Sequence, residues 1–138
     1  MTGQNTHSID AKGRLFIPAK LRERLGETFH VTIGQDHCLW VFSDESWGEF
    51  MAKVKGLPYS QVKRLRVLFA NAADCKPDTQ GRILIPAKLR EYASLDKDVT
   101  INGSVDRVEI WNTERWNAIE NDSLETGAWE TGMEEMGL

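Results

Sequence analysis

Two short segments of the sequence have residue types and a spacing that suit the recognition of an anion. Each has an aspartate four positions before an arginine, with a glycine directly before that arginine. They comprise Asp10, Gly13 and Arg14 in the first segment and Asp78, Gly81 and Arg82 in the second. The carboxylate can hold such a turn by accepting hydrogen bonds from backbone N–H groups or from the arginine. A guanidinium braced in this way can present its fork to a phosphate or to the edge of a guanine base.

The two segments belong to a longer internal repeat. Residues 10–23 read DAKGRLFIPAKLRE and residues 78–91 read DTQGRILIPAKLRE, so ten of the fourteen positions are identical. The similarity extends over about residues 7–50 and 75–119. Two copies are too few for a solenoid and favour a duplicated module with pseudo-twofold symmetry.

Further basic residues recur with the repeat. Lys12 adds a charge to the first turn, where the second turn has Gln80. Four more bases follow at equivalent positions: Lys20 and Arg22 in the first copy, and Lys88 and Arg90 in the second. We expect these four to lie on the exposed side of short helices and to be phosphate contacts secondary to Arg14 and Arg82. A single such helix is more often a solvated surface, but repetition of the basic residues weakens that interpretation.

Alternation and capping signals predict the elements that hold these turns. In the first copy we expect strands over 7–9, 14–17, 29–33 and 38–42, a helix that begins with Pro18 and ends at Gly26, and a helix capped by Ser43. In the second we expect strands over 82–85, 98–101 and 107–111, a helix that begins with Pro86, and a helix capped by Asn112. A connecting basic helix over 61–70, capped by Ser60, joins the copies.

These patterns divide the chain into four parts: a first repeat over 1–52, a connecting helix region over 53–72, a second repeat over 73–120 and an acidic tail over 121–138. We expect the tail to be poorly ordered or loosely packed, because it has little periodicity. Residues 106–138 hold nine acidic residues and two arginines, a sum of −7, which leaves fifteen basic and twelve acidic residues, or +3, for residues 1–105. The net charge of −4 therefore does not argue against a polyanionic partner.

The class of the protein follows from composition. The chain has 138 residues, of which 41% are hydrophobic and 28% charged, as in an ordinary globular protein. The N-terminal residues are polar, and no apolar run approaches the roughly 20 residues that span a bilayer. We therefore expect a cytoplasmic protein without a membrane partner.

Two other chemistries deserve comparison with anion binding. Asp10 and Asp78 could form a carboxylate pair that shares a proton, as in aspartic proteases, although an arginine four residues away would keep each carboxylate ionised. A zinc site could be assembled from His7, His37, Cys38 and Cys75, but these lack the spacing of zinc ligands. We expect the two cysteines to be small buried apolar side chains. No phosphate-loop, HExxH or GxSxG motif is present, so we predict no catalysis, cofactor or small-molecule substrate.

A pure scaffold is the third possibility, since five tryptophans and a small duplicated core also suit self-assembly. Self-assembly and nucleic-acid binding are compatible, because an oligomer multiplies the contacts of each weakly binding pair of turns.

With both turns in view, the chain resembles the MraZ family of bacterial transcriptional regulators, which are encoded at the start of the division and cell-wall gene cluster. The similar segments are HSIDAKGRLFIPAKLRERL, KRLRVLFANAADCKPDTQGRILIPAKLREYASL and VEIWNTERW. The resemblance implies an α+β, mainly β, fold. In that fold two pseudo-symmetric AbrB/SpoVT-like swapped-hairpin repeats form a double-split β-barrel with flanking helices.

The resemblance also implies a function. Members of the family bind double-stranded DNA at short repeated boxes in the promoter of their own operon, usually repress it, and form ring-like homo-oligomers, which implies a nucleoid-associated protein. The DNA-binding loop of the family corresponds here to Asp10, Lys12, Gly13 and Arg14, and to Asp78, Gly81 and Arg82. Within these loops we assign Asp10 and Asp78 to shaping the turn, and Arg14 and Arg82 to contacting DNA.

Overall fold

The computed structural model describes all residues 1–138 as a mixed α+β fold with eight strands. The strands are β1 Gln4–Ser8, β2 Arg14–Phe16, β3 Phe29–Ile33, β4 Leu39–Phe42, β5 Ala73–Cys75, β6 Arg82–Leu84, β7 Asp98–Ser104 and β8 Arg107–Asn112. The α-helices are α1 Ala19–Leu25, α2 Asp44–Lys55, α3 Tyr59–Val62, α4 Arg66–Ala70, α5 Ala87–Tyr92, α6 Thr113–Thr126 and α7 Ala128–Glu135. Two 3₁₀ turns, η1 Gln35–His37 and η2 Lys63–Leu65, complete the set.

The strands form two sheets that interleave the repeats. The larger sheet has the antiparallel order β1-β7-β8-β4-β3-β5, and the smaller one pairs β2 with β6. The first strand of each repeat therefore pairs with the hairpin of the other repeat: β1 pairs with β7, and β5 pairs with β3. The two hairpins meet through β4 and β8 at the centre. Neither repeat completes its own sheet.

One hydrophobic core lies between the two sheets and the helices that follow β2 and β6. Alternation along each short strand sends Leu15 and Ile83 inward, where both are fully buried. Helices α1 and α5 bury leucines spaced for one face, Leu21 and Leu25 in the first and Leu89 in the second. All of these residues belong to one cluster that draws on both repeats. The small halves thus gain a sufficient core by sharing it.

Most of the predicted helix boundaries are confirmed. Helices α1 and α5 begin at Ala19 and Ala87, one residue after the predicted starts, so Pro18 and Pro86 are the N-cap residues, and α1 ends at Gly26 with φ 84°. The Ser43 hydroxyl accepts a hydrogen bond from the Ser46 N–H, and the Asn112 side chain accepts one from the Arg115 N–H, each at 3.1 Å. These are the N-caps expected for α2 and α6.

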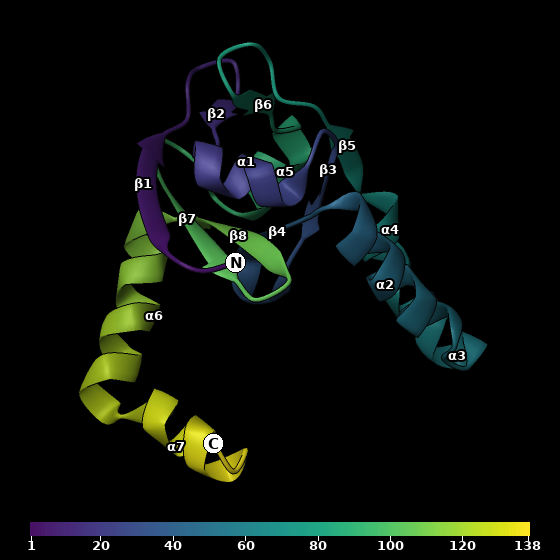
Figure 1. Cartoon of the computed structure of the whole chain (residues 1–138), viewed down its shortest axis with the longest axis vertical. Helices are drawn as coiled ribbons and strands as arrows, with labels where there is room; N and C mark the ends of the chain where they lie inside the picture. The colour runs from purple at the N-terminus through teal and green to yellow at the C-terminus, as the bar shows by residue number, and fades with distance from the viewer.

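The connecting helix differs from the prediction. It is divided into α3, η2 and α4, and its first helix begins at Tyr59 after Pro58, without a side-chain cap from Ser60. Proline already sets the backbone for the first helical residue, so a serine cap is not needed. Together α2, α3, η2 and α4, residues 44–70, form a helical arm that projects from the body (Figure 1).

Aromatic side chains attach this arm to the large sheet. Phe42 of β4 lies 5.4 Å from both Trp47 and Phe50, measured between ring centroids, and Trp47 lies 5.9 Å from Phe69 of α4. His30 of β3 stacks on Trp47 at 5.5 Å, and its two ring nitrogens contact Asp44 and Asp74. These contacts hold Trp47 against the sheet.

The C-terminal tail is helical and not poorly ordered. Residues 113–126 and 128–135 are helical, with the left-handed Gly127 (φ 73°) between α6 and α7. Trp116 anchors α6, since its ring lies 5.5 Å from Trp111 and its Nε1–H donates to Gln4 at 2.9 Å. Helix α7 buries no residue, which agrees with the expected alternative of loose packing. None of the helices has the length and apolar character needed to cross a membrane.

The paired strands β2 and β6 provide a test of the fold. Ile83→Ala should lower the free energy of unfolding by about 2–5 kcal/mol, because it leaves a cavity in the shared core. Leu84→Ala is the matched control: Leu84 is the next residue of the same strand but is 60% exposed, so its loss should cost less than about 0.5 kcal/mol. Urea denaturation of both variants measures the difference. Equal losses would contradict the described orientation of β6.

Candidate nucleic-acid interface

The β2–β6 ribbon determines which side chains face outward. Its register pairs Arg14 with Leu84, Leu15 with Ile83, and Phe16 with Arg82. Directly paired residues of an antiparallel ribbon lie on the same side, and alternate residues share a face. Because Leu15 and Ile83 are buried, the outward ribbon face consists of Arg14, Phe16, Arg82 and Leu84. Both arginines predicted to contact a partner lie on this face.

The two loops that precede the ribbon strands lie at one end of the molecule, away from the helical arm and the C-terminal helices (Figure 1). The first loop spans residues 10–13 and the second spans residues 78–81. Each loop is hydrogen-bonded to the opposite repeat. The Ile85 N–H donates to the Gly13 carbonyl at 2.9 Å, and the Ile17 N–H donates to the Gly81 carbonyl at 3.0 Å. The ribbon therefore holds the loops at fixed positions relative to each other.

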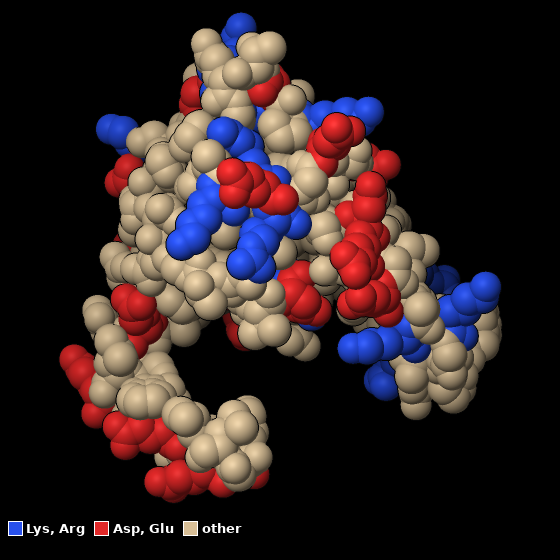
Figure 2. Space-filling view, in the orientation of Figure 1, with Lys and Arg blue, Asp and Glu red and all other residues tan.

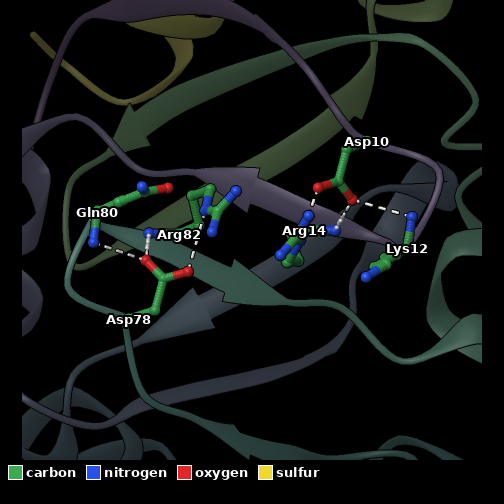
Figure 3. A network of polar contacts seen from close by, with 6 residues as sticks. All are labelled: Asp10, Lys12, Arg14, Asp78, Gln80 and Arg82. Atoms are coloured by element: carbon green, nitrogen blue, oxygen red, sulfur yellow. Dashed lines mark hydrogen bonds and ion pairs between the residues drawn. The ribbon is translucent and has the colours of Figure 1, made fainter.

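Asp10 organises the first loop through both carboxylate oxygens (Figure 3). One oxygen, Oδ1, accepts from the backbone N–H groups of Lys12 at 3.0 Å and Arg14 at 2.8 Å. The other, Oδ2, accepts from Nε of Arg14 at 2.6 Å. The backbone closes the same turn, as the Gly13 N–H donates to the Asp10 carbonyl at 3.0 Å.

Asp78 repeats this arrangement in the second loop. Its Oδ1 accepts from the backbone N–H groups of Gln80 and Arg82, each at 2.9 Å, and its Oδ2 accepts from Nε of Arg82 at 3.0 Å. The loop-shaping role predicted for the two aspartates is consistent with this geometry. Each carboxylate binds three N–H groups of its own loop and restrains one arginine (Figure 3).

The restrained arginines keep their terminal nitrogens available. Arg14 and Arg82 each pair with an aspartate through Nε alone, and no protein group bonds to the Nη atoms of either residue. Their side chains are 35% and 30% exposed, respectively. A guanidinium has five N–H donors, so each arginine can still offer its Nη pair to a planar acceptor.

The same hydrogen bonds keep the aspartates charged. The Arg14 backbone N–H is the main cause that lowers the pKa of Asp10 below its ordinary value of 3.8, partly opposed by desolvation and assisted by the Arg14 side chain. The Arg82 backbone N–H is likewise the main cause that lowers the pKa of Asp78. Both groups therefore remain carboxylates at neutral pH.

These facts bear on the alternative of a shared-proton pair. Such a pair needs two carboxyl groups that bind each other, and one of them must hold a proton. Asp10 and Asp78 instead bind separate loops, and their pKa values are lowered rather than raised. The arrangement does not match that of an aspartic protease.

The glycines of the loops contact arginines from the opposite repeat. Gly13 and Gly81 are buried and have φ values of 86° and 79°. A Cβ at Gly13 would lie 2.7 Å from Cζ of Arg90, and a Cβ at Gly81 would lie 1.6 Å from Nη1 of Arg22. The backbone conformation favours glycine at each position, and any side chain there would also displace the neighbouring guanidinium.

The expectation that Arg22 and Arg90 lie on an exposed helix face is wrong. Both are half-buried: Arg22 Nη1 donates to the Ile17 carbonyl at 2.9 Å, and Arg90 Nε donates to the Ile85 carbonyl at 3.0 Å. The Arg22 guanidinium also lies over the Phe16 ring at 5.2 Å. Each therefore bonds to the end of its own ribbon strand while it fills the space under the opposite loop. Of the four helix bases only Lys20 and Lys88 are exposed, as is Lys12 in the first loop.

The cysteines are buried, as predicted. Cys38 Sγ donates to the Gln35 carbonyl at 3.2 Å and Cys75 Sγ donates to the Leu84 carbonyl at 3.5 Å. Burial raises the pKa of Cys38 to about 12 and that of Cys75 to about 11. Both remain thiols with separate partners, whereas a zinc site would require thiolates that converge on one point.

Sequence reasoning missed two features of this surface. It treated residues 14–17 and 82–85 as apolar strands without distinguishing their faces, although alternation alone assigns Phe16 and Leu84 to the side of the arginines. It also could not detect the contacts of Arg22 and Arg90 with the opposite repeat. Aligning the two repeats shows which residues are equivalent, but it does not show which helix of one repeat packs against which loop of the other.

Comparison with known proteins agrees with the fold and the loops. The family described as "MraZ protein, putative antitoxin-like" matches residues 1–67 and again residues 68–131. The chain belongs to the MraZ family.

Relatives within the MraZ family cover most of the chain. It is 52% identical over 115 residues to a protein named transcriptional regulator MraZ from Carboxydothermus hydrogenoformans, a match that covers 81% of this chain and 80% of the relative. Proteins of the same name from Heliobacterium modesticaldum and Lachnoclostridium phytofermentans are 51% and 49% identical. The match to the Heliobacterium protein covers 82% of this chain and 81% of that protein. The match to the Lachnoclostridium protein covers 82% of this chain and 82% of that protein. The resemblance drawn from the tandem loops is thereby confirmed at the level of the family.

The contact between Gly81 and Arg22 can be tested by a double-mutant cycle. Gly81→Ala should destabilise the protein, because alanine is strained at positive φ by about 1–2 kcal/mol and because it displaces the Arg22 guanidinium. In an Arg22→Ala background the second cost should vanish and only the backbone strain should remain. Denaturation of the four proteins gives the coupling energy. Strictly additive losses would show that the two residues do not interact.

The aspartates predict a dependence on acid pH. Their folded-state pKa values are lowered, so their contribution to stability is complete above the unfolded value of about 4 and disappears as the pH falls through the lower folded value. An NMR titration should therefore show the Nε resonance of Arg14 unchanged from pH 8 to 5 and moving only below 3.8. Asp10→Asn should abolish that transition. A midpoint above 3.8 in the wild type would contradict the hydrogen-bond geometry.

Proposed function

We propose that the chain is a sequence-specific DNA-binding transcriptional regulator that reads duplex DNA through its two loops. Its target would be short repeated boxes in the promoter of its own division and cell-wall operon, which it would repress. The relatives reported above are named transcriptional regulators, which supports this general function. The geometry of the two loops supports the proposed mode of DNA binding.

One observation carries the proposal. Two guanidinium groups, Arg14 and Arg82, lie on the same outward face, each restrained through Nε by an aspartate and each with unpaired Nη atoms. Restraint reduces the side-chain entropy that binding would otherwise cost, and a paired set of Nη donors fits O6 and N7 of a guanine or two phosphate oxygens. A salt bridge that served only to close the turn would not need this orientation in both copies.

The surrounding residues receive distinct roles in this proposal. Lys12, Lys20 and Lys88 are exposed and would bind phosphates as mobile point charges. Asp10 and Asp78 shape the loops, and Gly13 and Gly81 provide their backbone conformation. We reassign Arg22 and Arg90 from direct phosphate binding to positioning of the opposite loop, since their guanidinium groups already bond to main-chain carbonyls.

The two loops are not equal binding elements. Gln80 occupies the position of Lys12, so the second loop has one positive charge fewer. Leu84 and Phe16 also differ where they flank the arginines, and the exposed Leu84 could pack against a thymine methyl group. We propose that the first loop contributes more of the phosphate affinity.

The wider arrangement belongs to the same proposal. The repeats 1–52 and 73–120 each supply one loop and together would form the swapped-hairpin, double-split β-barrel of the family, with 53–72 and 121–138 outside the DNA surface. A ring-like homo-oligomer in the cytoplasm, associated with the nucleoid, would engage several boxes at once. Such multivalency raises the affinity of individually weak loops.

Arg14→Ala tests the central assignment. The variant should lose specific binding to the upstream region of its own gene, because each good bidentate base contact is worth about 1–3 kcal/mol and several copies engage the DNA together. A gel-shift titration at two salt concentrations measures the loss. Unchanged promoter affinity would remove Arg14 from the interface.

Two variants separate base reading from charge. Arg14→Lys keeps the positive charge but loses the planar fork, so specificity should fall while the salt dependence stays nearly constant. Lys20→Ala should instead weaken binding to all sequences and reduce the salt slope by about 1. If Arg14→Lys bound like the wild type, Arg14 would be a phosphate contact rather than a base contact.

A further inference from the structure

An apolar groove lies in the helical arm, at the end of the molecule opposite the loops. It measures about 440 Å³ and is lined by Gly48, Met51, Ala52, Val54, Lys55, Val62 and Phe69. Its volume falls within the range of about 300–1,000 Å³ that is usual for ligand pockets. Met51 at its edge and Leu57 and Val67 on the same arm are also exposed. Apolar exposure of this extent on one element indicates a contact surface.

The C-terminal helix α7 has the complementary property. Trp129, Met133 and Met136 are all exposed and are spaced four and three residues apart, which places them on one face of the helical turn. The rest of the chain leaves this face uncovered, since all three side chains are exposed and α7 has no buried residue. A tryptophan and two methionines form an unusually large exposed apolar surface for so short a helix.

The charges around the two surfaces are opposite. The arm, residues 44–70, has five basic residues, all in its outer part: Lys53, Lys55, Lys63, Arg64 and Arg66. Its three acidic residues, Asp44, Glu45 and Glu49, lie in the first half of α2, next to the body. Residues 116–138 contain six acidic residues and no lysine or arginine: Glu120, Asp122, Glu125, Glu130, Glu134 and Glu135. Figure 2 shows blue atoms concentrated on the outer part of the arm and red atoms along the C-terminal helices. Such complementarity gives register and orientation to a contact.

The two surfaces of one chain do not meet. The arm and α7 lie on opposite sides of the body, with open space between them (Figure 1). We propose that α7 of one copy docks in the arm groove of a second copy, with Trp129 and Met133 in the groove and Glu130 and Glu134 facing the basic residues of its rim. The occupant is an acidic, Trp- and Met-containing helix, whereas the DNA backbone would leave the apolar groove empty.

This contact joins two different surfaces, so it is heterologous and can be propagated from copy to copy into a closed ring. A single eight-residue helix buries less than the roughly 800 Å² per partner of a standard interface. The pairwise contact would therefore be weak, and closure would stabilise it. The inference specifies the interface of the homo-oligomer proposed above and rests on that part of the proposal, while DNA binding by the loops is independent of it.

Trp129→Glu and Ala52→Glu test the two sides of the contact. Neither residue is buried in the chain, so both variants should fold. Sedimentation velocity of the full chain over a range of concentrations should show that each variant weakens association by at least about tenfold, as expected for loss of an aromatic anchor or for a charge in its pocket. Lys55→Glu and Glu134→Lys should each weaken association, and the double variant should restore part of it.

Mixing two single-cysteine variants locates the contact. A chain with Ala52→Cys and a separate chain with Met133→Cys should form an intermolecular disulfide on oxidation, because the buried Cys38 and Cys75 do not compete. An intact oligomer in Trp129→Glu would overturn the tail contact but leave the oligomer proposal standing. A monomeric wild type at all concentrations would overturn both. Loss of DNA affinity in Lys55→Glu with unchanged association would identify the arm as a nucleic-acid surface and also overturn the inference.

Discussion

The candidate interface depends on one interaction, the binding of three N–H groups by a single aspartate carboxylate in each loop. Asp10 joins two backbone donors of its turn to Nε of Arg14, and Asp78 does the same with Arg82. Because the backbone and the side chain are held by the same anion, the direction of the guanidinium is set by the turn itself. Charge-assisted bonds of this kind are stronger than neutral ones, and the lowered pKa of each aspartate is their electrostatic consequence.

The second constraint is the exchange between repeats. Arg22 of α1 occupies the space that the missing side chain of Gly81 leaves, and Arg90 of α5 does so beneath Gly13. Each loop is thus built partly by its own repeat and partly by the other. This arrangement explains why a glycine and an arginine recur together in both copies: each pair is a contact between the two repeats.

The helix boundaries could be predicted, because they are set by the backbone conformation and hydrogen bonds of residues close together in the sequence. Pro18 and Gly26 delimit a helix through backbone conformation, and Ser43 and Asn112 cap helices through bonds three residues away. The partial burial of Arg22 could not be predicted, because it depends on a strand order that brings α1 of one repeat against Gly81 of the other. The helices of the tail were not predicted, because α7 buries no residue and the apolar spacing of Trp129, Met133 and Met136 is too short a pattern to identify a helix by itself.

The two repeats differ mainly on the surface that a bound partner would contact, at the loop tips and on the outward face of the β2–β6 ribbon. Of the four differences between residues 10–23 and 78–91, only Leu15 against Ile83 lies in the core, and it exchanges one buried aliphatic side chain for another. The other three, at positions 11, 12 and 16 of the first copy, alter the loop tip or the outward ribbon face. Packing tolerates little divergence between halves that share one core, whereas an outward face can diverge freely. The molecule therefore combines a nearly symmetric scaffold with two unequal loops, and a duplex bound across both would be contacted with a defined polarity.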